Sequence, residues 1–168
     1  YSKNIVKKMT EAGYDVQVFC LNAASMGVPQ KRERVFFIGH KKELKFKKLR
    51  LEFNEKPILF KDYRNKENIN PDKQDTVKAK LWHKVKQGFA FSKIHETGSF
   101  FNDYKLSANS ICPTLTADNN HGAWDYITPR MLDKLELCQV GTYPLDYDFQ
   151  SLAPKYLIGM SVPPVMTA

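Results

Sequence analysis

The stretch Gly27–Gly39, GVPQKRERVFFIG, decides the fold because a short basic turn runs directly into an apolar strand. Pro29 fixes its own φ and biases Val28 towards extended backbone, so the turn enters the strand tightly. The apolar run Val35–Ile38 is continuous, which is typical of a strand covered on both faces in an α/β sheet. We therefore predict a strand over residues 34–39 within such a sheet.

The polar side chains at the start of this strand form a candidate binding site. Side chains repeat every second residue along a strand, so Arg32 and Arg34 share one side, and Gln30 joins them if the extension starts early. Guanidinium and amide groups at the end of a buried strand can bind anions and base edges. Spacing alone also allows a solvated basic turn, since most charge clusters are only surface.

Four elements are expected at the start of the chain. A helix over residues 2–12 has an apolar face and a stop signal at Gly13, and a strand over residues 15–21 follows. A loop over residues 22–31 then leads into the strand described above. Helix, strand, loop and strand in this order are typical of one edge of a doubly wound sheet.

Further elements are expected downstream. Alternating residues over 49–53 predict an exposed strand, and a four-residue apolar repeat over 77–88 predicts a helix with Trp82 in the core. The other expectations are a polar loop over 61–75, short strands and loops over 98–116, a turn at 118–122, a helix beginning at Thr128-Pro129 and an irregular segment over 141–153.

Composition narrows the class of protein. The chain has 168 residues and a net charge of +8, which favours a polyanionic partner, of which DNA is the simplest. No apolar run approaches the ~20 residues of a membrane span and no signal peptide is visible, so we expect a cytoplasmic protein without a membrane partner. Three cysteines far apart fit a reducing compartment. The chain opens at Tyr1 without methionine and closes just after Pro163-Pro164, as expected for a piece of a longer protein.

Four stretches carry a resemblance to a known family. The string Asn22–Arg34, NAASMGVPQKRER, resembles the Gln-x-Arg-x-Arg motif of the DNA cytosine-5 methyltransferases, the eighth of their ordered motifs. Gly159–Val165, GMSVPPV, resembles the final motif, Gly-Asn-x-Val-Pro-Pro, with Met160 in place of asparagine. Ile127–Arg130, ITPR, resembles the ninth motif, and Pro113–Ala117, PTLTA, resembles the Thr-Leu segment near the end of the recognition region.

The order and spacing of these stretches agree with the family over residues 22–165, although Met131 and Leu137–Pro144 depart from the ninth motif's usual continuation. The resemblance implies an α/β fold: a partial S-adenosylmethionine-dependent methyltransferase (Rossmann-like) sheet with a smaller mixed α+β target recognition domain. The implied domains are residues 1–43, the C-terminal strands of the catalytic domain, 44–128, the target recognition domain, and 129–168, the return to the catalytic domain.

The resemblance also implies site residues. Gln30, Arg32 and Arg34 would hold a flipped nucleotide, with Arg34 at the cytosine O2 edge and Arg32 on the phosphate side. The other implied roles are a pocket for the cofactor S-adenosylmethionine at Gly159, Met160, Ser161 and Val162, DNA contacts from Thr114 and Thr116, and a structural role for Arg130. The implied DNA partner is double-stranded, in a bacterial or phage-like restriction-modification setting.

Part of the family's chemistry is missing from this sequence. The reaction needs an extruded cytosine and a thiolate that attacks C6. In the family the thiol comes from a Pro-Cys-Gln loop and an acid from a Glu-Asn-Val motif, and neither occurs here. We expect Cys20, Cys112 and Cys138 to be structural, and the isolated chain to be inactive without the first half of the catalytic domain, in the same chain or in a separate subunit.

The sequence pattern assigns no catalytic or metal-binding role to the histidines or to the remaining acidic residues. The histidines show no metal-ligand spacing with the cysteines, so no metal site is expected. Glu96, Asp118 and Asp125 are interpreted as ordinary loop acids. Two alternatives stay open: a non-catalytic basic DNA-binding subunit or module that kept the methyltransferase fold, and an unrelated basic RNA-binding protein.

Overall fold

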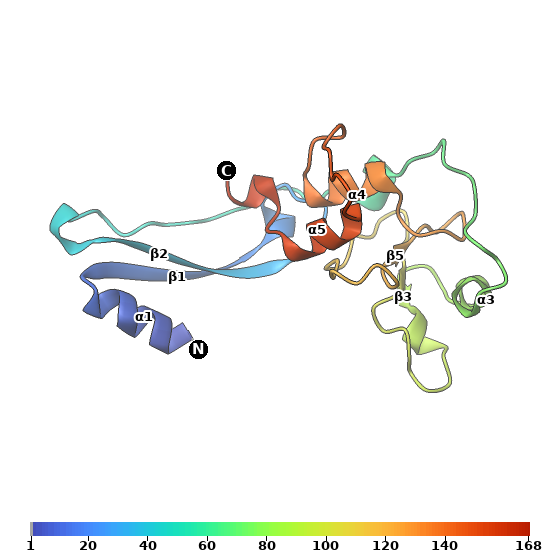
Figure 1. Ribbon diagram of the computed structural model, residues 1–168, viewed down its shortest axis with the longest axis horizontal. Helices are drawn as coiled ribbons and strands as arrows, with labels where there is room; N and C mark the ends of the chain where they lie inside the picture. Colours follow the sequence, from blue (N-terminus) through green and yellow to red (C-terminus); the bar gives the residue numbers. More distant parts are fainter. Residues whose placement is uncertain (1) are drawn as a thin grey trace.

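The computed structural model describes residues 2–168, and Figure 1 shows a long hairpin joined to a rounder lobe. Helix α1 (Ser2–Glu11) precedes β1 (Tyr14–Asn22), and a loop with the 3₁₀ turn η1 (Ala23–Ser25) leads into β2 (Glu33–Lys41). The strands β1 and β2 pair antiparallel along their whole length. The predicted order of helix, strand, loop and strand is therefore confirmed.

The hairpin is less covered than the sequence predicts. Val18 on β1 and Val35 on β2 are both about half exposed, because this sheet has only two strands in residues 2–168. The predicted strand over residues 49–53 is wrong, since no strand forms in this segment. Instead the side-chain amide of Gln17 donates to the Leu49 carbonyl (3.0 Å) and accepts from the Leu49 N–H (2.7 Å).

The lobe, residues 56–168, contains short helices around a small mixed sheet. In the sheet β4 lies between β3, which is antiparallel to it, and β5, which is parallel. No helix in residues 2–168 is long and apolar enough to cross a membrane. The remaining elements are η2 (Lys42–Leu44), α2 (Phe60–Tyr63), α3 (Val77–Lys84), β3 (Phe89–Ala90), η3 (Phe91–Lys93), β4 (Tyr104–Lys105), β5 (Ala123–Trp124), α4 (Lys134–Gly141), α5 (Pro154–Met160) and η4 (Pro164–Met166).

Helix α3 confirms the predicted helix but turns a different face to the core. Ala79 and Trp82 are buried, whereas Val77 of the predicted apolar stripe is mostly exposed. The indole N–H of Trp82 donates to the Asp125 carbonyl (2.7 Å), and its ring packs in a cluster with Phe91. This anchor sets the rotation of the helix and confirms the core role of Trp82.

Helix α4 begins later than the sequence predicts. Thr128-Pro129 lies in a loop closed by a bridge between Trp124 and Met131, so the prediction of a helix start there is wrong. Asp133 is the N-cap: its side chain accepts from the Glu136 N–H (3.0 Å), and the Glu136 side chain accepts from the Asp133 N–H (3.0 Å). This reciprocal capping box satisfies two amide donors that the first helical turn leaves free.

Arg130 ties this loop to helix α4. Its guanidinium is buried and forms a two-pronged pair with Glu136 (2.7 and 2.9 Å), and it also lies 3.1 Å from an oxygen of Asp125. The Nε and Nη2 groups donate to the carbonyls of Asn68 (3.0 Å) and Asn65 (3.3 Å). Burial opposes the charge, but the contacts with Glu136 and Asp125 outweigh it and raise the pKa of Arg130.

Asp125 is a buried anchor, not the ordinary loop acid predicted from sequence. Its carboxylate is fully buried and accepts hydrogen bonds from the Arg64 Nε (3.0 and 2.9 Å) and from the Ile127 N–H (2.9 Å). Arg130 therefore contacts both Asp125 and Glu136, and Arg64, which pairs with Asp125, supplies the second positive charge that balances these two carboxylates. Buried charges of this kind are tolerable only when each one has a partner.

We expect Arg130→Met to lower the free energy of unfolding by about 3–5 kcal/mol, because Glu136 is left as a buried charge without its partner. The double variant Arg130→Met/Glu136→Leu should recover part of this loss, since both charges are then removed while Asp125 keeps Arg64. Urea unfolding measures both values, with exposed Lys134→Met on the same helix as control. An equal loss of unfolding free energy in the single and the double variant would contradict the coupling between Arg130 and Glu136.

The cap of α4 should give a pH-dependent contribution to stability. Burial raises the pKa of Asp133, but hydrogen bonds from Glu136, Asn68 and Asn65 outweigh burial, and the net pKa is lowered. The carboxylate therefore stabilises the fold above its unfolded-state pKa, and this contribution is lost as pH falls through the native pKa. We expect Asp133→Ala to cost about 1–2 kcal/mol at neutral pH. In urea unfolding, the free energies of unfolding of Asp133→Ala and of the unaltered chain should become more similar below about pH 4. Exposed Asp146→Ala should show no such convergence.

Candidate functional site

Three segments far apart in sequence meet just before β2. Gln30 forms a parallel bridge with Cys112, and the Lys31 N–H donates to the Cys112 carbonyl (2.8 Å). The Thr114 hydroxyl donates to the Lys31 carbonyl (2.5 Å). The end of α5 completes the group through contacts with Arg32. The stretch singled out by sequence is thus the point at which the lobe joins the hairpin.

Arg32 is the centre of this junction. Only 1% of the residue is exposed, and its Nη1 donates to the Leu115 carbonyl (3.0 Å). Its Nη2 donates to the carbonyls of Gly159 (2.8 Å) and Ser161 (2.7 Å), while its Nε is buried without a partner. Burial and then the charge of Arg34 lower the pKa of Arg32. The side chain expected to face a phosphate points instead into a cage of backbone carbonyls.

Gln30 faces the same interior. Its amide is fully buried, accepts from the Arg32 Nη1 (3.3 Å) and the Leu115 N–H (3.3 Å), and donates to the Val140 carbonyl (3.4 Å). Arg34 is different, because it is only half-buried and its single hydrogen bond is to the Glu33 carbonyl (2.7 Å). Of the three residues singled out at the start of this strand, Arg34 is the one whose free donors are not buried.

Gly159 allows the closing segment to approach the 112–116 segment closely. A Cβ at this position would lie 2.4 Å from the Thr116 carbonyl carbon and 2.5 Å from the Ala117 nitrogen. Gly159 and Met160 are the last residues of α5, and the chain leaves the helix at Ser161. Only glycine permits two backbones to touch in this way.

The four residues expected to line a cofactor pocket divide into two kinds. Gly159 packs against the Thr116 backbone, and the Ser161 hydroxyl donates to the Ile158 carbonyl (3.0 Å). Met160 is 66% exposed and Val162 is also exposed, so their apolar side chains are free to contact a ligand. Met160 and Val162 therefore fit an apolar wall of a cofactor site. None of the four side chains supplies a polar group that would anchor the cofactor.

The expected DNA contacts lie on an exposed ridge beside this junction. Thr114 and Thr116 are both exposed. Buried Lys155 supports the ridge from below, because its ammonium donates to the Thr116 carbonyl (3.2 Å) and to the Asp118 carbonyl. Burial lowers the pKa of Lys155, and the charges of Asp118 and Asp103 oppose this shift. The sequence offered no signal for Lys155.

The cysteines differ from one another in exposure. Cys112 and Cys138 are buried, and burial raises the pKa of both thiols, which keeps them protonated. Cys20 on β1 is exposed. A nucleophilic thiol needs a lowered pKa, so Cys112 and Cys138 are unsuited to attack a base.

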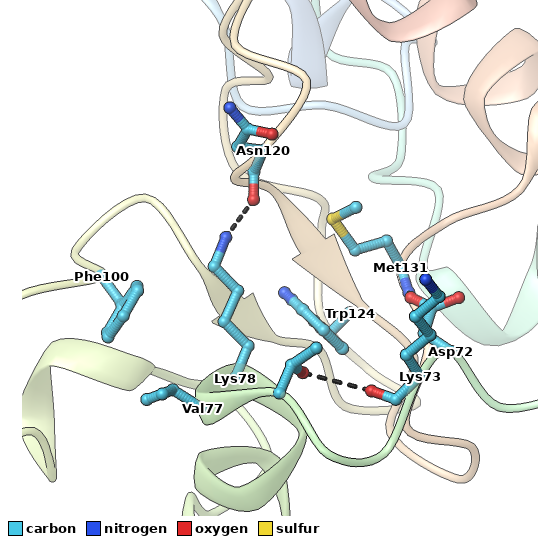
Figure 2. Close-up of a pocket in the computed structure, with 9 residues that line it drawn as sticks. Asp72, Lys73, Val77, Lys78, Phe100, Asn120, Trp124 and Met131 are labelled. Atoms are coloured by element: carbon cyan, nitrogen blue, oxygen red, sulfur yellow. Dashed lines mark hydrogen bonds between the residues drawn. The ribbon is translucent and has the colours of Figure 1, made fainter.

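A second cluster organises the lobe around the buried carboxylate of Asp103. It accepts from the Lys78 ammonium (3.2 Å), the indole N–H of Trp124 (2.9 Å) and the Gly122 N–H (3.2 Å), and lies 2.5 Å from the His121 Nδ1. These contacts fasten α3, the turn at 118–122 and β5 together. Figure 2 shows Lys78 reaching from α3 towards Asn120 of that turn, across a hollow lined by Trp124.

Comparison with known proteins places this architecture. A family model for C-5 cytosine-specific DNA methylase matches residues 1–168. Type II methyltransferase M.FnuDI of Fusobacterium nucleatum is 35% identical over 112 residues, covering 65% of this chain and 31% of that protein. M.DdeI of Desulfomicrobium norvegicum is 50% identical over 44 residues, covering 26% of this chain and 11% of that protein. The chain thus spans about a third or less of these relatives.

Solved structures agree in fold. The methyltransferase EhMeth of Entamoeba histolytica superposes with a TM-score of 0.68 at 12% identity, covering 98% of this chain and 54% of that one. The Dnmt2 methyltransferase of S. pombe gives a TM-score of 0.62 at 14% identity, covering 99% and 59%. Because the family model matches the whole chain, the protein belongs to the C-5 cytosine-specific DNA methylase family.

Proposed function

We propose that this chain is the C-terminal portion of a DNA cytosine-5 methyltransferase of a restriction-modification system, and that the whole enzyme methylates C5 of a flipped cytosine in duplex DNA. The observation that carries the proposal is the convergence of residues 30–34, 112–116 and 159–161 on the Arg32 guanidinium. This junction brings together the stretches that resemble the family's eighth motif, final motif and Thr-Leu segment, with Arg34 at its edge. We keep the domain boundaries 1–43, 44–128 and 129–168 as part of this proposal.

Arg34 is the residue that contacts the flipped nucleotide in this proposal. It is half-buried, charged and hydrogen-bonded only to the adjacent Glu33 carbonyl, so most of its planar donors are free for a base oxygen or a phosphate. Thr114 and Thr116 lie exposed on the neighbouring segment and would contact the same DNA. The part of the lobe that lies within the proposed target recognition domain, residues 56–128, would read sequence in the major groove.

Arg32 and Gln30 act as positioning residues in the proposal, a role different from the direct nucleotide contact that the resemblance implies. Their polar atoms bind the Leu115, Gly159, Ser161 and Val140 backbones. This holds the ridge of Thr114 and Thr116 at a fixed distance from Arg34. A guanidinium suits the task because it donates in several directions within one plane.

S-adenosylmethionine, when bound, supplies an electrophilic methyl group. Met160 and Val162 would form an apolar wall against it, since both side chains are exposed at the end of α5. Gly159 and Ser161 would set the position of that wall through their packing with Thr116 and Arg32. The Rossmann-like sheet that carries the rest of such a pocket is proposed to be completed by the first half of the catalytic domain.

The attacking thiol is proposed to come from that first half, in the same chain or in a separate subunit. The raised pKa values of Cys112 and Cys138 support this view, and Cys20 lies on β1 of the hairpin. The part of the chain described here would then hold and orient the DNA while another segment attacks C6.

Substitution of Arg32 should lower the stability of the fold, whereas substitution of Arg34 should weaken DNA binding. Arg32→Met leaves three carbonyls without their charged donor, and we expect the free energy of unfolding to fall by about 3 kcal/mol. Arg34→Met should change stability by less than about 0.5 kcal/mol, yet weaken duplex binding about tenfold because a charged donor to the DNA is removed. Urea unfolding and fluorescence anisotropy at fixed salt measure the two effects. Normal DNA affinity in Arg34→Met would remove Arg34 from the proposed site.

Methyl transfer should require the missing half. We expect no transfer of tritiated methyl groups from S-adenosylmethionine to duplex DNA by this chain alone. Addition of a matching N-terminal half that contains the Pro-Cys-Gln loop should restore transfer, and a Cys→Ser change in that loop should abolish it. Transfer by the isolated chain would contradict the proposal. DNA binding without transfer by the combined halves would favour a non-catalytic DNA-binding module.

A further inference from the structure

The loop between η3 and β4 contains an aromatic residue in a rarely adopted backbone conformation. Phe100 has a φ of 64°, in the left-handed region that bulky side chains avoid. Its ring lies against the rings of His95 (centroids 4.9 Å apart) and His121 (6.0 Å), with the Lys78 ammonium 5.6 Å from its centre. A conformation of this kind persists only where the surroundings hold it, and such positions cluster at functional sites.

Phe100 points inward. Figure 2 shows its ring on one side of a hollow of about 610 Å³, with Met131 and Asp72 on the opposite side. The Asp103 N–H donates to the Phe100 carbonyl (3.0 Å), so the turn is also tied to the buried Asp103 cluster. Phe100 therefore serves as the fixed base of the loop.

The next residue, Phe101, is exposed to solvent. Phe101 is 73% exposed, the largest exposed fraction among the big apolar residues of the described chain. Figure 1 shows the yellow-green loop after β3 projecting from the lobe on the side away from α4 and α5. Single exposed apolar residues are common on protein surfaces. Here, however, an aromatic ring is presented on a strained and anchored turn, which makes it a rigid contact.

The surroundings of this loop are strongly basic. Residues 77–101 contain five lysines and a single acidic residue, Glu96. Lys84, Lys86 and Lys93 line a shallow groove of about 250 Å³ together with Val85, Phe89 and Ile94, and no acidic residue lines it. Lysines grouped without a carboxylate partner attract phosphate. Phe101 follows Phe100, whose ring lies against His95, the residue after Ile94 of the groove. An exposed aromatic ring suits the flat face of a base.

We propose that Lys84, Lys86 and Lys93 bind backbone phosphates of duplex DNA and that the Phe101 ring stacks on, or wedges beside, a base of the same duplex. The inference rests on the proposed function and adds a contact surface remote from Arg34. Stacking tolerates any sequence because every base has a π-face. A wedge of this kind opens a base step and bends the duplex, which brings more DNA surface against the protein.

Duplex binding at several salt concentrations tests the aromatic contact. We expect Phe101→Ala to weaken binding about tenfold with an unchanged salt slope, since no charge is removed. Phe101→Trp should keep or improve affinity. Phe46→Ala is the matched control, because Phe46 is 62% exposed beside β2 and its ring contacts only His40 among the aromatic rings of the described chain. Circular-dichroism melting checks that each variant is folded.

The same titrations test the lysine groove. Lys84→Gln/Lys86→Gln/Lys93→Gln should lower the salt slope by up to about 3, or about 1 for each phosphate that the variant no longer binds. Lys3→Gln/Lys7→Gln/Lys8→Gln on α1 removes the same charge from exposed lysines of the hairpin and should leave the slope unchanged. Equal slopes for the two triple variants would overturn the groove as a phosphate site.

Tryptophan fluorescence of Phe101→Trp reports stacking directly. The native Trp82 and Trp124 are buried, so the introduced indole is the exposed one. Duplex DNA should quench it and shield it from acrylamide. Absence of quenching, wild-type affinity of Phe101→Ala, or quenching by single-stranded RNA and not by duplex DNA would each overturn the proposal. If the unaltered chain binds no duplex DNA, the proposed function also fails, whereas unchanged loop variants of a DNA-binding chain would remove this inference alone.

Discussion

The junction between hairpin and lobe depends on one guanidinium in a cage of backbone carbonyls. Arg32 brings its charge out of water and recovers the cost through donors directed at Leu115, Gly159 and Ser161. These acceptors come from segments 83 or more positions away in the chain. A single side chain thus fixes the relative position of β2, the Thr114–Thr116 ridge and the end of α5. Arg34, two residues further along β2, inherits its position from this arrangement.

The lobe uses the same principle with carboxylates. Arg130 and Arg64 neutralise Glu136 and Asp125, while Lys78 and two N–H donors satisfy Asp103. The lobe has little regular structure, so these buried polar centres provide the order that a larger sheet would provide by burial of apolar surface. Buried charges require fixed partners, which explains why irregular loops here hold a defined shape.

The opening elements were predictable because they depend on local patterns. Periodicity in residues 2–39 predicted α1, β1 and β2, and the Gln-x-Arg-x-Arg resemblance located the junction. The direction of the Arg32 side chain was not predictable, because its acceptors are carbonyls that any sequence supplies. Asp125 likewise became an anchor through partners distant in sequence. The start of α4 could have been found, since Asp133 and Glu136 have capping-box spacing, but the Thr128-Pro129 signal competed with it.

The close approach at Gly159 has a mechanical consequence. Backbones in direct contact, with no side chain between them, cannot slide past each other without losing packing on both sides. A ligand that displaces Ser161 would therefore also displace Thr116, and the reverse holds. A ligand bound at Ser161 and a ligand bound at Thr116 would then change each other's affinity through one coupling free energy, which is the same in both directions.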